Sequence, residues 1–119
     1  MSSTETTPLI QNFSVPAGDA MQVNFNVDPD GAISLLGSNI EWNVYKQQHG
    51  VITDQTPILT KTLDNGLQID DPLTWTFHVT LLEADTIDLL GNYRHSGKVT
   101  IEGSKITVVD GVMCVTESK

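Results

Sequence analysis

The feature that most constrains the fold is a strict alternation of apolar and polar residues from position 73 to 81. A β-strand places successive side chains on opposite faces, so this segment predicts a strand with one dry face and one threonine-rich wet face. Similar alternation runs through residues 21–27 and 40–45. Helical periodicity is nearly absent, so the chain is predicted to be all-β.

Turn signals separate these segments about every ten residues, a spacing typical of a sandwich. They include Asp28-Pro29-Asp30-Gly31 and Asp64-Asn65-Gly66, in which proline fixes φ and glycine allows a positive φ. We predict an immunoglobulin-like two-sheet β-sandwich of about seven to eight mostly antiparallel strands. One short helical turn is expected near 83–90, capped by Asp85 and ended by Gly91. The residues from Lys46 to Gln55 read as a connecting loop or irregular edge.

The alternation also predicts the core, and we expect one domain over residues 9–116, with a flexible lead at 1–8 and a tail at 117–119. Trp42 and Trp75 lie in phase with aliphatic neighbours, which favours core packing over a sugar-stacking platform. The predicted core residues are Met21, Val23, Phe25, Ile40, Trp42, Val44, Leu73, Trp75, Phe77, Val79, Tyr93, Val99 and Val108.

Charge and cysteine content restrict the partners and the compartment. Fifteen acidic residues against six basic ones give a formal net charge of −9, and the basic residues are scattered, which argues against direct nucleic-acid binding. The single Cys114 cannot form a disulfide within the chain and is expected to be partly buried and inert. No signal-like leader and no apolar run of about 20 residues is found, so we expect synthesis in the bacterial cytoplasm and no membrane insertion.

The candidate chemical motifs favour structural interpretations. The Asp28–Asp30 turn resembles the start of a calcium loop, but the twelfth position is Gly37 in place of a bidentate glutamate. His49, His78 and His95 lack ligand-like spacing and are interpreted as scattered surface residues. We therefore expect no catalytic residue, no cofactor and no metal requirement.

Two landmarks resemble a known family. The run Leu89-Leu90-Gly91-Asn92-Tyr93-Arg94-His95 resembles a tyrosine corner, and it follows Asp85-Thr86. Upstream, Gly18-Asp19 and the run from Asp30 to Trp42 complete the pattern, with Leu36 in place of the usual Thr or Ser. Together they resemble the immunoglobulin-like domain at the N-terminus of phage baseplate upper proteins and related phage or prophage tail and neck proteins. The resemblance implies a non-enzymatic, virion-associated structural protein that docks on other virion structural proteins or on itself.

The expected contact surface is the sheet face with Tyr45 and the segment that follows it. The candidate residues are Tyr45, Lys46, Gln47 and His49. The strand at 58–63 is expected to be a sheet edge that can accept a partner strand. The alternative function is a carbohydrate-binding or adhesion module of a phage or bacterial surface protein, with weak glycan binding at Tyr45.

Overall fold

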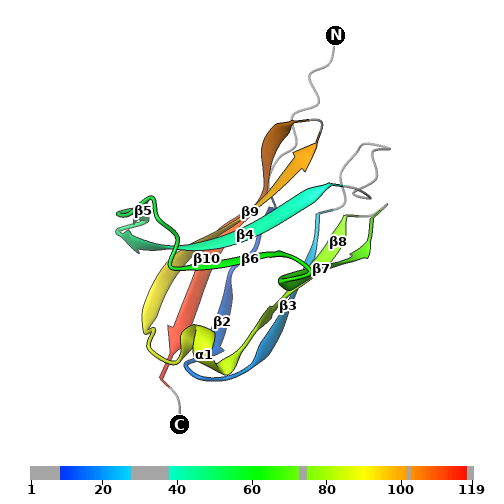
Figure 1. Ribbon diagram of the computed structural model, residues 1–119. Coiled ribbons are helices and arrows are strands. Elements are labelled where there is room, and N and C mark those ends of the chain that lie inside the picture. The colour runs from blue at the N-terminus through cyan, green and yellow to red at the C-terminus, as the bar shows by residue number, and fades with distance from the viewer. Residues whose placement is uncertain (1–8, 28–37, 73–74, 102, 118–119) are drawn as a thin grey trace.

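The computed structural model describes residues 9–27, 38–72, 75–101 and 103–117. Most of these residues form β-strands, so the all-β prediction is confirmed, and the described part contains one helical turn, α1 (Glu83–Thr86) (Figure 1). The strands are β1 (Leu9–Ile10), β2 (Phe13–Pro16), β3 (Met21–Asn26), β4 (Asn39–Gln48), β5 (Val51–Ile52), β6 (Leu59–Leu63), β7 (Gly66–Asp71), β8 (Thr76–Leu81), β9 (Gly91–Ile101) and β10 (Ser104–Thr116).

These strands form one large mixed sheet in the order β1-β10-β9-β4-β6-β7-β8-β3, with β2 also pairing with β10 and β5 with β4. Most pairs are antiparallel, but β1 and β2 both run parallel to β10. The sheet curls until it nearly closes. As a result, the rings of Phe25 on β3 and His95 on β9 lie only 5.9 Å apart between centroids. Gln11, between β1 and β2, bridges the gap by donating a side-chain hydrogen bond to the Asn24 carbonyl of β3 at 2.9 Å.

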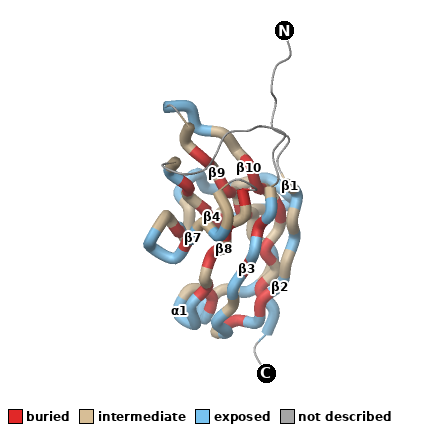
Figure 2. The backbone as a smooth tube through the Cα atoms, turned by 90° about the vertical axis from the view of Figure 1, so that its right-hand side faces the viewer, coloured by how far each residue is buried: buried red, intermediate tan, exposed pale blue. Residues whose placement is uncertain are grey.

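The core lies inside this curled sheet and largely follows the predicted alternation. Trp42 is fully buried and Trp75 is 3% exposed, which confirms that both tryptophans pack in the core. Met21 and Tyr93 are only half-buried, at the starts of their strands, and Leu73 lies outside the described residues. Red, buried positions alternate along β9 and β10 in Figure 2. The other predicted core residues are all buried: Val23, Phe25, Ile40, Val44, Phe77, Val79, Val99 and Val108.

Two predicted strand boundaries are wrong. Trp75 has a φ of 54°, in the left-handed region, so β8 begins only at Thr76. The segment from Lys46, predicted as a connecting loop or irregular edge, is not a loop at its start: β4 continues to Gln48, and a hairpin leads into the short β5, which pairs with β4. His49 and Gly50 make the turn with φ values of 55° and 82°, as a two-residue turn with positive φ at both positions requires.

The predicted edge at 58–63 is covered by a second strand only at its end, where β6 pairs with β7. The turn between β6 and β7 contains Asp64 and Gly66, whose φ values are 63° and 93°. The chain then runs parallel to the end of β6, pairing at Thr62 and Leu63 only. The rest of β6 has β4 as its one strand neighbour among the described residues.

The helical turn is shorter than the predicted 83–90 and ends well before Gly91, and Asp85 caps it from within its first turn. Asp85 is its third residue and accepts the backbone N–H of Leu82 at 2.7 Å. Lys61 of β6 donates to the same carboxylate oxygen at 2.7 Å, and the Thr86 hydroxyl accepts the Gly18 N–H at 3.0 Å. These contacts hold α1 against β6 and the β2–β3 turn. No helix in the described residues is long and apolar enough to span a membrane.

Candidate functional site

The predicted contact residues lie together on the last part of β4 and in its turn to β5, which projects at one side of the sheet (Figure 1). We call Tyr45, Lys46, Gln47 and His49 the hairpin surface. Lys46 and His49 are exposed, whereas Tyr45 and Gln47 are half-buried. That these four residues form one contact surface stays a prediction, because Tyr45 and Gln47 share one face of β4 whereas Lys46 points to the opposite face.

The hairpin is held in place by Arg94 on β9 and by Gln47 of β4 itself. Arg94 of β9 donates to the Gly50 carbonyl at 2.9 Å and to both carboxylate oxygens of Asp110 on β10 at 2.7 and 2.8 Å. Gln47 accepts the Gly50 N–H at 2.6 Å and donates to the Asn92 carbonyl at 3.2 Å. The planar guanidinium has a fixed fork of donors, so it fixes the turn relative to both strands. A surface ordered in advance loses less conformational entropy on binding.

Tyr45 lies at the centre of this arrangement. It pairs with Arg94 across the β4–β9 ladder, and Arg94 pairs in turn with Val112 of β10. Val51, beyond the turn, is 66% exposed. Tyrosine and arginine are the residues enriched at the energetic centres of protein interfaces, so this chemistry suits protein contact. Sequence reasoning found Tyr45 but missed Arg94, whose pairing with β4 is not visible in the local pattern.

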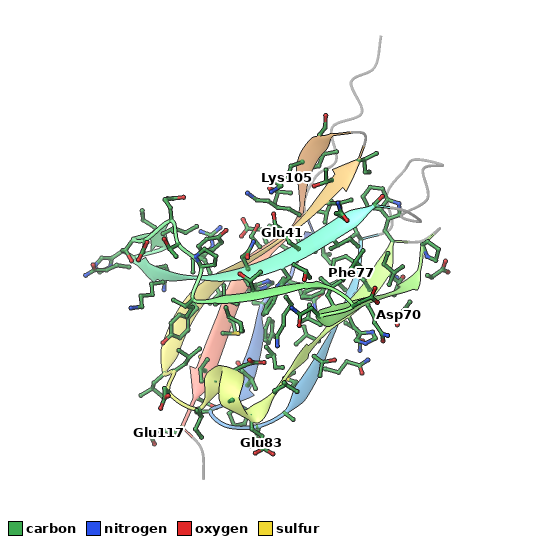
Figure 3. All side chains as sticks on the ribbon, viewed as in Figure 1. Glu41, Asp70, Phe77, Glu83, Lys105 and Glu117 are labelled. Atoms are coloured by element: carbon green, nitrogen blue, oxygen red, sulfur yellow. The ribbon has the colours of Figure 1, made fainter. Side chains whose placement is uncertain are left out.

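The same side of the sheet carries an ion pair farther along β4. Lys105 lies 2.7 Å from Glu41 (Figure 3), beside a shallow cleft of about 440 Å³. The hydrogen bond from Lys105 lowers the pKa of Glu41, and the same contact raises the pKa of Lys105. Glu41 is therefore held in its charged form, which does not suit a general acid near neutral pH. The cleft is lined by Asn39, Ile40, Glu41, Thr62, Leu63, Thr100 and Lys105.

A second cleft, of about 250 Å³, lies beside β7 and β8 and includes His78 in its lining. The His78 Nδ1 atom lies 2.9 Å from both carboxylate oxygens of Asp70. In the part of the chain that the structure describes, no group of three or more His, Cys, Asp or Glu side chains could hold a metal ion. The Asp28 and Asp30 turn lies outside the described residues.

The interpretation of His95 as a surface residue is wrong, because its side chain is completely buried. His95 lies on the inner face of β9, in phase with Gly97 and Val99. Its Nδ1 accepts the indole N–H of Trp42 at 3.1 Å, and its Nε2 lies 2.6 Å from the Gln11 carbonyl oxygen. Burial is the main cause that lowers the pKa of His95. Its alternation with Val99 indicated an inward-facing side chain. The polarity of histidine led instead to the surface assignment.

Cys114 is half-buried on β10, which agrees with the predicted partly buried thiol. Comparison of the chain with protein-family models and with curated proteins finds no match. Strand pairing and side-chain contacts are therefore the basis on which a function is proposed.

Proposed function

We propose that this chain is a non-enzymatic interaction module with an immunoglobulin-like fold. In this proposal it is a structural component of a phage or prophage virion, in the tail, baseplate or neck. It docks through the hairpin surface on another virion protein or on a second copy. The observation that carries the docking proposal is the hairpin that Arg94 and Gln47 hold in place around Tyr45.

The strand pairing supports the immunoglobulin-like part of the proposal. One group of strands contains β10, β9, β4 and β6, and a second contains β7, β8 and β3. The two groups are joined by only two paired positions, between β6 and β7. Two antiparallel groups connected in this way, with an N-terminal strand parallel to the last strand, fit an immunoglobulin-like sandwich.

Two side-chain features support the same assignment. The Tyr93 hydroxyl lies 3.2 Å from both the N and the O of Leu90, the backbone contact expected of a tyrosine corner. In antibody domains a disulfide cysteine follows that tyrosine by two residues and packs against a buried tryptophan. Here the equivalent position is His95, whose ring contacts Trp42 and Phe25. A ring cluster would thus replace the disulfide, as a chain with one cysteine requires.

The charge of the chain suggests the kind of partner surface. With a formal net charge of −9, the domain repels other acidic surfaces and is attracted to basic ones. Arg94 lies opposite Tyr45 in the β4–β9 ladder and places a positive group beside it. We therefore expect a partner surface that is apolar or acidic where it meets Tyr45 and basic outside that area. Association with such a partner should be faster at low salt.

Replacing Tyr45 with alanine tests this proposal. We expect the wild-type chain to capture a structural protein encoded by a neighbouring gene, and Tyr45→Ala to weaken the measured affinity about tenfold or more, because truncation of a central interface tyrosine commonly costs about 2 kcal/mol. Calorimetric titration with each purified neighbour measures the affinity. Gln68→Ala, an exposed change on β7, is the matched control and should bind like wild type.

Two results would contradict the docking proposal. The first is that the wild-type chain binds none of the neighbouring structural proteins and does not self-associate. The second is that Tyr45→Ala binds as tightly as wild type while both have the same thermal midpoint. Binding to a glycan array that is lost in Tyr45→Ala would instead support the adhesion alternative.

A further inference from the structure

The ring of His95 has a defined protonation state in this fold. The Trp42 indole nitrogen carries a hydrogen and can only donate, so its 3.1 Å contact makes the His95 Nδ1 atom an acceptor. The proton of the neutral ring must then be on Nε2, which donates to the Gln11 carbonyl at 2.6 Å. A second proton, on Nδ1, would direct its N–H at the Trp42 N–H. The neutral ring is fully satisfied and the charged ring is not.

One segment covers the outer side of this ring. We call residues 9–16, which comprise β1, β2 and Gln11–Asn12 between them, the N-terminal strap. Gln11 caps the Nε2 atom, and the Phe13 ring lies 5.2 Å from the His95 ring between centroids. Release of the strap would therefore open the imidazole to water, whereas the other ring neighbours, Trp42 and Phe25, belong to long core strands.

The strap is attached by its pairing with β10, by polar contacts and by Val15, which is fully buried in the core. It pairs in parallel with β10 over two residues in β1 and four in β2. Gln11 donates its N–H to the Asp110 carbonyl at 2.9 Å, and the Asn12 side chain accepts the Val112 N–H at 2.8 Å. Gly111 is opposite His95 in the ladder, and a Cβ added there would clash with the Gln11 backbone oxygen. The close approach of Gln11 to His95 thus depends on a glycine at position 111.

We propose that His95 is a pH-sensitive latch for the N-terminal strap. The neutral imidazole binds Gln11 and holds the strap on β10, and protonation breaks the contact with Trp42 and releases the strap. Release would leave the outer edge of β10 unpaired and would remove the Gln11 side chain from the Asn24 carbonyl on β3. Unpaired strand edges are sites where another strand can add.

The charges around the ring determine the direction of the pH effect. Asp110 on β10 favours the charged ring and Arg94 on β9 opposes it, while burial has the largest influence and lowers the pKa of His95. The ring neighbours on β2, β3 and β4 are Phe13, Phe25 and Trp42, which carry no charge. A released ring has a pKa of about 6.5. The released state therefore binds the proton first, so the strap is held fully above about pH 6.5 and less as the pH falls below it.

Amide hydrogen exchange at pH 7.5 and pH 5.0, corrected for intrinsic exchange rates, tests the latch. We expect protection of residues 9–16 to fall by about 10- to 30-fold at pH 5.0, the range that one proton taken up below about pH 6.5 allows, while β8 keeps its protection. In nuclear magnetic resonance spectra, the indole N–H signal of Trp42 should shift with the same midpoint and that of Trp75 should not.

Variants separate the latch from general acid instability. His95→Gln keeps a neutral donor toward Gln11 and should remove the pH dependence of strap protection, whereas His49→Gln and His78→Gln should retain it. Gly111→Ala should release the strap at pH 7.5.

The proposal is overturned if strap protection is the same at both pH values, if His95→Gln keeps the full pH dependence, or if β8 loses protection together with the strap. If His95→Gln does not fold, titration of the His95 ring in the wild-type chain decides. Full protonation of the ring with the strap still protected would overturn the latch.

Discussion

Trp42→Ala is expected to lower the free energy of unfolding by about 3–5 kcal/mol, the range measured for large aromatic truncations in protein cores. Trp42 is fully buried, and its ring lies 6.4 Å from Phe13 and 5.8 Å from His95 between centroids. The truncation would leave a cavity between these rings. It would also remove the Trp42 indole N–H, which donates to the His95 Nδ1 atom. Urea unfolding followed by circular dichroism measures the loss.

Trp42→Phe is the matched control, because it keeps an aromatic ring but removes the indole N–H. We expect it to cost less than Trp42→Ala, and the difference between the two variants measures packing apart from the hydrogen bond. A loss below about 1 kcal/mol for Trp42→Ala would show that the site collapses around the truncated side chain or that Trp42 is not central to the core.

The alternation of side chains predicted most of the core because it depends only on local geometry. Residues such as Val23, Trp42 and Phe77 are buried for the reason inferred from the sequence, namely that every second residue of a strand faces inward. Turn residues such as Asp64 and Gly66 likewise have the backbone conformations that their chemistry favours. These features require no knowledge of which strands pair.

Features that depend on long-range pairing were not predictable from the sequence. The position of β6 between β4 and β7 is set by strand order, which no local pattern encodes. His95 is buried because Gln11 and Trp42, which are far away in the sequence, satisfy both ring nitrogens. Buried polar groups are tolerated only where such partners exist. Polarity alone therefore placed His95 on the surface incorrectly.

The candidate site likewise combines a residue that local alternation predicts with contacts that depend on strand pairing. Tyr45 was predicted because its phase on β4 directs it away from the core. The His49-Gly50 hairpin was missed, since this pair is not the usual Asn-Gly or Asp-Gly signal. The contribution of Arg94 follows from the pairing of β9 with β4 and from its contacts with Gly50 and Asp110. Those contacts join three separate segments of the chain.

Asp85→Ala is expected to lower the free energy of unfolding by about 3 kcal/mol, because it leaves a buried ammonium group without its partner. Lys61 is 7% exposed, and its Nζ atom lies 2.7 Å from the Asp85 carboxylate. The same carboxylate oxygen accepts the Leu82 N–H at 2.7 Å, so the substitution also removes a contact that orders the start of α1. Thermal and urea unfolding at neutral pH measure the loss.

Two further variants show whether the cost arises from the unpaired charge. Lys61→Met removes the charge but keeps a long apolar stem next to Gly66, where the Lys61 stem leaves no room for a Cβ. If the isolated ammonium group is the main penalty, the double variant Lys61→Met/Asp85→Ala should be more stable than Asp85→Ala alone, with a coupling energy of at least about 1 kcal/mol. Glu83→Ala removes an exposed acid from the same turn and should change stability by less than about 0.5 kcal/mol. Additive losses in the double variant would mean that Asp85 stabilises the fold through its contact with Leu82 and that the ion pair with Lys61 adds nothing.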